Sequence, residues 1–312
     1  MSEKNKSYLD LAKKIIWLRL AQIIINDRYK MGEFNIPIHL ALGHESIAVA
    51  IDAMIRDNDA LFLTHRNIHY NLIRMGSVKE ELDEYNLKES GLAKGKLGSM
   101  NLSNPEKNII YSSSILGNNL AVGSGFALAN KIKNQNSVVF IVTGDGAIEE
   151  GVFYESLLFL KSNKLPSVII VENNDWSLGT RINERRANID LNYLAKSLDI
   201  KYQLLKENDT LDYINKLSKI KSDVMITRSP FIVEVKLTTL GYWYMKNKNF
   251  PRGKFINYHA GPAPEIQLKG KEYPLIINND SDPLFVLSQH IEMDKLIIFS
   301  KNIQKEILEE FS

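Results

Sequence analysis

Three runs rich in valine and isoleucine constrain the fold of this chain most. They read SVVFIVTG up to Gly144, PSVIIVEN up to Asn173 and PFIVEVKLTT up to Thr239, without the strict alternation of a strand that has one face in water. Segments with a helical pattern lie between the runs, at 149–163 and 189–200. The order strand, helix, strand, helix, strand is typical of a doubly wound parallel sheet with helices on both faces. We therefore predict an α/β fold.

The composition allows one large domain and excludes several kinds of site. A chain of 312 residues can bury a substantial core. We expect a single domain over 1–312, with a helical segment at about 1–60 and C-terminal helices at about 282–312. The 39 Lys and Arg residues nearly balance the 37 Asp and Glu residues, which argues against nucleic acid as a partner. Cysteine is absent, which excludes disulfides, thiolate metal sites and a cysteine nucleophile.

The N-terminal segment has apolar residues at helical spacing and carries Lys and Arg throughout. This pattern indicates an amphipathic helix over 8–30 and disfavours both a signal peptide and a membrane span. Two further helices are expected at 44–55 and 118–133. We expect a cytoplasmic protein that has no membrane partner.

A carboxylate between two glycines follows the first run. Asp145 lies between Gly144 and Gly146, at the carboxyl edge of the expected sheet, where sites form in such folds. Glycines let backbone N–H groups approach a phosphate, and a helix that begins near Ala147 adds an N-terminus that favours anions. Asn174, after the second run, offers an amide oxygen. With a nearby peptide carbonyl and a diphosphate, these oxygens suit octahedral Mg²⁺, although either motif alone is more often a plain turn.

Together the two motifs resemble the thiamine-diphosphate signature in the α subunits of 2-oxo-acid dehydrogenase E1 components. Asp145 and Asn174 are 29 positions apart (174 − 145), within GDGAIEEGVFYES and LPSVIIVENNDWSLGT. The segments FNIPIHLALGHES, GLAKGKLGSMNL and SSSILGNNLAVGSG, and the stretch after Asp282, are also similar to that family. The resemblance spans nearly the whole chain. It implies the thiamine-diphosphate-binding fold, with this chain as the diphosphate-binding (PP-type) domain.

The resemblance also implies roles for individual residues around thiamine diphosphate and Mg²⁺. The Mg²⁺ ligands would be the side chains of Asp145 and Asn174 and the backbone carbonyl of Trp176. The remaining cofactor-binding positions would be Thr64, His65 and Arg66, whose guanidinium would clamp the diphosphate, Ser114 and Leu116 at the aminopyrimidine ring, and Gly144, Gly146 and Ala147 beside the diphosphate.

The histidines fall into different groups. His39 and His65 lie in matching motifs, which implies that they line the site and take part in catalysis. His259, in NYHAGPAPE, comes later than the loop histidine of the dehydrogenases. It either contacts the diphosphate and transfers a proton near the reacting centre or only orders the loop. His69 is one position out of register, and His290 is expected on the surface of a C-terminal helix.

Three departures from the family pattern concern the substrate. Asn101 stands where the family has a histidine after Gly-Ser-Met, and the family's phosphorylatable serine context is missing. An aromatic and basic run occupies 241–255 and contains Lys246, Lys248, Arg252 and Lys254. This run is either a surface loop or a receiver for a phosphorylated or nucleotide-linked substrate or an acidic carrier domain.

The resemblance implies an enzyme that decarboxylates a 2-oxo acid and transfers the acyl or aldehyde unit. Because the chain matches only the diphosphate-binding half, a β subunit is expected to supply the glutamate that contacts the pyrimidine ring, in an α2β2 assembly. A lipoyl acyltransferase is a further candidate partner.

Three other interpretations compete with this one. A two-chain transketolase-like carboligase that acts on sugars or in secondary metabolism is the main alternative, and a scaffold with a decayed site is another. A nicotinamide dehydrogenase is disfavoured, because GSGFAL at 123–128 lacks the third glycine and YSSSILGNN is a poor strand.

Overall fold

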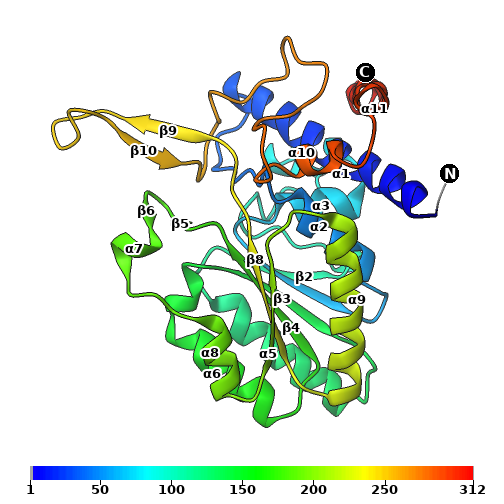
Figure 1. Ribbon diagram of the computed structural model, residues 1–312, viewed down its shortest axis with the longest axis vertical. Coiled ribbons are helices and arrows are strands. Elements are labelled where there is room, and N and C mark those ends of the chain that lie inside the picture. Colours follow the sequence, from blue (N-terminus) through cyan, green and yellow to red (C-terminus); the bar gives the residue numbers. More distant parts are fainter. Residues whose placement is uncertain (1–2, 312) are drawn as a thin grey trace.

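A six-stranded parallel sheet forms the centre of the molecule. The computed structural model describes residues 3–311 of the chain. The strands follow the order β2-β1-β3-β4-β8-β7 (Figure 1). Their bounds are β1 (Ala60–Thr64), β2 (Ile109–Ser113), β3 (Val139–Gly144), β4 (Ser167–Asn173), β7 (Lys201–Leu205) and β8 (Phe231–Lys236). The predicted α/β fold with a doubly wound parallel sheet is therefore confirmed.

Helices cover both faces of the sheet, and the apolar strands divide their side chains between two cores. In β3, Phe140 and Val142 belong to one core, and Val139 and Ile141 belong to the other. This division follows from the two-residue period of a strand, and it explains why the runs show no polar alternation. The first core contains α2 (Glu45–Met54) and α9 (Thr210–Thr227), and the second contains α5 (Asn118–Ile132), α6 (Gly151–Ser162) and α8 (Leu191–Ser197).

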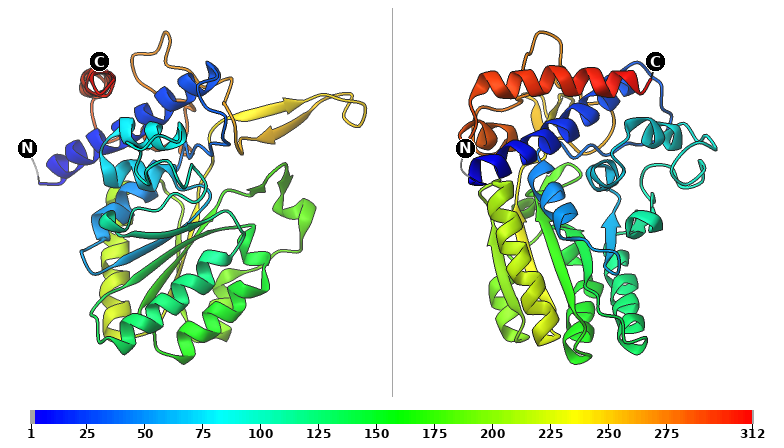
Figure 2. Two further views of the ribbon diagram at one scale, coloured as in Figure 1. Left: turned by 180° about the vertical axis from the view of Figure 1, so that it is seen from behind. Right: turned by 90° about the vertical axis from the view of Figure 1, so that its right-hand side faces the viewer.

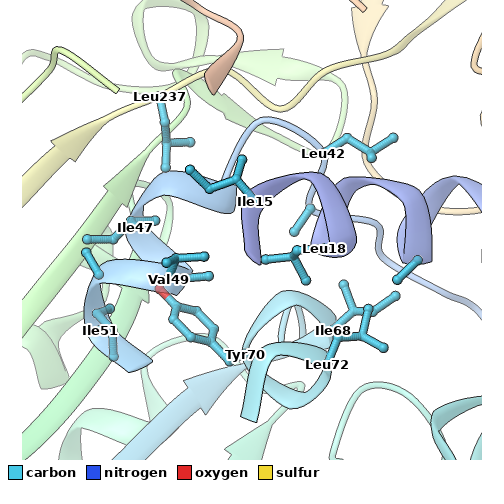
Figure 3. Close-up of a cluster of buried hydrophobic side chains, with 14 of the residues drawn as sticks. Ile15, Leu18, Leu42, Ile47, Val49, Ile51, Ile68, Tyr70, Leu72 and Leu237 are labelled. Carbon is cyan, nitrogen blue, oxygen red and sulfur yellow. The ribbon is translucent and has the colours of Figure 1, made fainter. Parts of the chain in front are cut away.

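A helical layer lies over the carboxyl edge of the sheet (Figures 1 and 2). It contains α1 (Glu3–Lys30), α3 (Ile68–Met75), α4 (Val78–Tyr85), α10 (Pro283–Ser288) and α11 (Met293–Glu309). Ile15 and Leu18 of α1 pack with residues of α2 and α3, among them Val49 and Leu72 (Figure 3). In Figure 2, α1 and α11 lie side by side, so the first and the last helix of the described chain pack together in this layer.

A hairpin projects from the body beyond the carboxyl end of β8 (Figure 1). It consists of β9 (Tyr242–Met245) and β10 (Lys254–Asn257), which pair antiparallel. The smaller elements are β5 (Trp176–Ser177), β6 (Thr180–Arg181), α7 (Ile182–Arg185) and the short 3₁₀ helices η1 (Pro105–Lys107) and η2 (Ala147–Glu149). No helix among residues 3–311 has both the length and the apolar character of a membrane span. The cytoplasmic location stays a prediction.

The structure corrects three details of the sequence interpretation. The segment judged a poor strand contains the end of β2, whose residue Ile109 pairs with Leu61 at the sheet edge. The strand β7 and the helix α9 both lie between the second and third predicted strands, so that connection is longer than one helix. His290 lies in the turn after α10 instead of in a helix, although it is exposed as expected.

Candidate active site

A cavity lies at the carboxyl edge of the sheet and brings most of the predicted site residues together. Its walls enclose about 630 Å³ of space, part of which is open to solvent. The predicted residues that line it are Thr64, His65, Arg66, Leu116, Gly144, Asp145, Gly146, Ala147, Asn174, Trp176 and His259. Ser114 does not line the cavity; its backbone N–H donates to Asn101 Oδ1 (3.1 Å), and Ser113 takes its place in the wall. His39 lies behind this wall, in ring contact with His65 and His259.

Asp145 is a buried carboxylate at the end of β3, with 3% of its surface exposed. Burial raises its pKa, although Arg185 opposes the shift through a hydrogen bond from Nη2 to Asp145 Oδ2 (2.8 Å). The guanidinium of Arg185 also donates to Glu149 Oε1 (2.6 Å). At Gly146, a Cβ atom would lie 2.9 Å from Ser177 Oγ, so the close approach of the next loop requires glycine there.

Asn174 follows the neighbouring strand β4, and two hydrogen bonds fix the orientation of its amide. Its Nδ2 donates to Thr239 Oγ1 (2.8 Å), and its Oδ1 accepts from the backbone N–H of Trp176 (3.0 Å). The carbonyl oxygen of the amide is therefore on the side of the 175–176 turn. Asp145 and Asn174 line the same cavity because β3 and β4 are adjacent parallel strands whose carboxyl ends meet at one edge.

These groups fit a hard cation and a phosphate. Asp145 and Asn174 offer a carboxylate and an amide oxygen, and a peptide carbonyl at Trp176 would complete the hard-oxygen donors that Mg²⁺ prefers. Thr143 also lines the cavity, and its buried Oγ1 has no hydrogen-bond partner. A buried polar atom without a partner is uncommon, and beside a cavity such an atom is available to a ligand. The assigned roles of the single residues stay predictions.

A buried polar network behind Asn174 was missed by the sequence analysis. Thr239 Oγ1 lies 2.8 Å from His44 Nε2, and His44 Nδ1 lies 3.3 Å from Glu172 Oε2. The second oxygen of Glu172 accepts from Tyr70 (2.8 Å) and lies 3.3 Å from His69 Nε2. Burial alone would raise the pKa of Glu172, but His44 and His69 hold that pKa below its usual range. The signal was the glutamate inside an apolar strand, because a buried carboxylate needs such partners.

Arg66 is buried and binds two loops through their backbone carbonyls. One terminal nitrogen donates to Leu40 O, and Nη2 donates to His259 O (3.0 Å). It lines the cavity as predicted, but these bonds also give it a structural role that the sequence did not indicate. The guanidinium thus holds the segment after His39 and the loop that contains His259 beside His65, the residue that precedes Arg66.

His39, His65 and His259 therefore form a cluster, which we call the histidine cluster. Their ring centroids are 4.7 Å (His39–His65), 5.0 Å (His39–His259) and 5.6 Å (His65–His259) apart. Burial first, and then the positive charge of Arg66, lower the pKa of His39 to about 2, of His65 to about 3 and of His259 to about 4. All three rings are neutral at neutral pH, so each has a nitrogen that can accept a proton and one that can donate.

The basic run at 241–255 forms the projecting hairpin instead of a cavity wall. Lys254 Nζ pairs with Glu184 Oε1 (3.0 Å), and Phe255 contacts the ring of Trp176 at 6.1 Å between centroids. The hairpin is thus anchored beside the cavity through the first two residues of β10. Whether it receives a substrate or a carrier domain stays a prediction.

Comparisons of the sequence with known proteins agree on one family. Residues 17–236 match the family described as dehydrogenase E1 component. The α subunit of the pyruvate dehydrogenase E1 component from Rickettsia bellii is 30% identical over 233 residues, which cover 74% of this chain and 71% of that protein. The mitochondrial counterpart from Saccharomyces cerevisiae is 32% identical over 172 residues, covering 55% of this chain and 40% of that protein.

Solved structures agree in fold. A transketolase variant from Pichia stipitis, in complex with fructose 6-phosphate, is similar with a TM-score of 0.60 and 16% identity. The similarity covers 97% of this chain but only 46% of that chain. A transketolase from Leishmania mexicana gives a TM-score of 0.54 at 12% identity, over 97% of this chain and 45% of that chain. At these identities the likeness concerns the fold alone.

Proposed function

The chain belongs to the dehydrogenase E1 component family as an E1α-like, thiamine-diphosphate-dependent protein, and on that premise we propose how its cavity is used. The reaction is the decarboxylation of a 2-oxo acid, followed by transfer of the resulting acyl or aldehyde unit. The observation that carries this proposal is the meeting of Asp145, Asn174 and Trp176 in one cavity. Bound thiamine diphosphate would supply the nucleophilic carbon and the electron sink for decarboxylation.

The residues of the chain would bind the metal and the cofactor and orient them. Asp145, Asn174 and the Trp176 carbonyl would hold Mg²⁺, and the backbone N–H groups of Gly146 and Ala147 would donate to the diphosphate. The neutral rings of His65 and His259 line the cavity, where they can accept or donate a proton without adding charge. If Asp145 Oδ2 is the oxygen that binds the metal, its hydrogen bond from Arg185 has to break first.

We further propose a β subunit as the partner that completes the site. Ile115 and Leu116 lie at the cavity with 67% and 45% of their surface exposed, and adjacent exposed apolar side chains at a cavity favour cover by another surface. The β subunit would supply the glutamate for the pyrimidine ring, in an α2β2 assembly. Pyruvate is the first substrate to assay, because the relatives named above are subunits of pyruvate dehydrogenase. The transketolase-like alternative has less support, because transketolases share the fold alone.

Calorimetry of the chain, co-purified with its β-type partner, tests the metal site. Thiamine diphosphate should bind only when Mg²⁺ is present, and Asp145→Asn should abolish this binding because it removes the anionic ligand. Asp57→Asn is the matched control, since it removes the same charge from an exposed position before β1 that does not line the cavity. Equal binding by the Asp145→Asn and Asp57→Asn variants would contradict the proposed metal site. Turnover by the α chain alone would contradict the requirement for a β subunit.

A further inference from the structure

The histidine cluster has the geometry of a metal site. His39 comes from the segment before α2, His65 follows β1 and His259 follows β10, so three distant parts of the chain meet here. Each residue offers one ring nitrogen, and these three nitrogens lie within 4.8 Å of one another. Three histidines with a fourth position left open are a known ligand set for zinc.

The chemistry of the cluster differs from that of the Asp145 site. Imidazole nitrogens favour zinc, cobalt, nickel and copper, whereas carboxylate and carbonyl oxygens favour magnesium. Metal binding needs neutral rings, and burial together with Arg66 keeps the pKa of all three histidines well below neutral pH. Moreover, Nδ1 of His39 is buried and has no hydrogen-bond partner. That nitrogen is therefore available to bind a metal ion.

Arg66 holds the cluster together in advance of any ligand. Its bonds to Leu40 O and His259 O fix the backbone beside two of the three histidines. Pre-organised ligands lose less conformational freedom on binding, which favours affinity. The positive charge of Arg66 opposes a cation, which argues for a moderate affinity that chelators can reverse.

We propose that His39, His65 and His259 bind one zinc-class divalent cation, with its fourth position toward the cavity. Binding requires only this chain. The consequence for catalysis rests on the proposed function: because His65 and His259 line the cavity, the ion would occupy space that the substrate needs. Zinc should therefore inhibit turnover, and a chelator should restore it.

Cobalt titration of the full-length chain, free of any histidine tag, tests the site without cofactor or partner. One equivalent of Co²⁺ should give the intense visible absorption of four-coordinate cobalt, zinc should displace it, and excess Mg²⁺ should not. His259→Gln should weaken cobalt binding about tenfold or more, as should His39→Gln. His290→Gln, an exposed histidine outside the cluster, is the matched control and should bind cobalt like the wild type.

The outcomes separate this inference from the proposed function. Circular dichroism identifies a variant that has not folded, and the other cluster variant then decides. Wild-type cobalt affinity in a folded His259→Gln or His39→Gln protein would overturn the proposal, as would absence of the cobalt spectrum in the wild type. Asp145→Asn should keep the cobalt spectrum, because its carboxylate lies outside the cluster. Failure of thiamine diphosphate to bind would therefore leave the cobalt result intact.

Discussion

Glu84 is a buried side chain whose two oxygens accept four backbone N–H bonds from one loop. Oε2 accepts from Ala93 and Gly95 (2.8 Å each), and Oε1 accepts from Leu97 (2.9 Å) and Gly98 (3.0 Å). The loop at 93–98 has no regular structure of its own, so this carboxylate replaces the missing backbone partners. The loop leads directly to Ser99 and Asn101 beside the candidate site.

The first prediction at the residue scale concerns this carboxylate. Glu84→Gln replaces one acceptor by an NH₂ group that faces two N–H donors, and it should lower the free energy of unfolding by about 2–4 kcal/mol. Urea unfolding measures this change. Glu80→Gln, on the exposed side of α4, is the control and should change stability by less than about 0.5 kcal/mol. Similar losses in both variants would mean that the loop does not depend on Glu84.

The second prediction at this scale concerns pH. The pKa of His39 is lowered to about 2 in the folded protein. Below about pH 6.5, therefore, this histidine binds a proton in the unfolded chain but not in the folded chain. The stabilising contribution of neutral His39 is present above that pH and is lost as the pH falls. His39→Gln should therefore reduce the slope of unfolding free energy against pH between about pH 7 and pH 5. Identical slopes in both proteins, from urea unfolding at several pH values, would contradict it.

At the scale of elements, adjacent parallel strands bring polar groups to the same edge. Asn174 follows β4 and Thr239 follows β8, and the pairing of these strands places the Thr239 hydroxyl against the Asn174 amide. Thr239 is itself bonded to His44 at the start of α2. Such outer contacts orient the ligands of a metal and influence its affinity.

The prediction at this scale is that Thr239→Val weakens Mg²⁺-dependent binding of thiamine diphosphate by about 10–100-fold. The variant keeps the shape of the side chain but removes the acceptor that fixes the Asn174 amide. Calorimetry at several Mg²⁺ concentrations should show a higher metal requirement. Thr210→Val is the control, because Thr210 Oγ1 is buried without a partner at the start of α9, away from the cavity. Equal metal requirements for the two variants would argue against the network.

At the scale of the whole molecule, one buried ion cluster joins the N-terminal and the C-terminal parts of the chain. Arg19 of α1 bonds Glu45 at the start of α2 (Nε–Oε1, 2.6 Å) and Asp282 before α10 (Nη2–Oδ1, 2.9 Å). All three side chains have no exposed surface. Burial raises the pKa of Asp282, but Arg19 and backbone N–H groups outweigh it and hold that pKa below its usual range. The single domain over 1–312 stays a prediction.

The prediction at this scale is a large loss of stability in Arg19→Leu. Two buried carboxylates would lose their counter-ion, which costs about 3–5 kcal/mol. The midpoint of urea unfolding should fall strongly, and the deficit should shrink at acid pH, where the carboxylates are protonated. Lys14 lies on α1, as Arg19 does, and forms an exposed ion pair with Asp52 of α2. Lys14→Leu should lower the free energy of unfolding by no more than about 1 kcal/mol. A pH-independent deficit would point to lost packing in place of unpaired charge.

The sequence by itself determined the three neighbouring strands β3, β4 and β8, the α/β class of the fold and the motif at Asp145 and Asn174. These features depend on local residue types and short spacings: valine and isoleucine runs for strands with two buried faces, and glycines where a backbone turns closely past a neighbour. The edge strand β2 was not predicted, because its last residues are serines, which have a weak strand propensity. Its place in the sheet comes from pairing with β1.

Only the tertiary structure decided which distant side chains meet. The histidine cluster joins positions 39, 65 and 259, and the network behind Asn174 joins Glu172 with His44, His69 and Thr239. No spacing in the sequence encodes these contacts, because they arise where the ends of strands and the loops of the helical layer converge. The structure likewise decided that Arg66 binds backbone carbonyls, since its partners are fixed by the path of two loops and not by residue type.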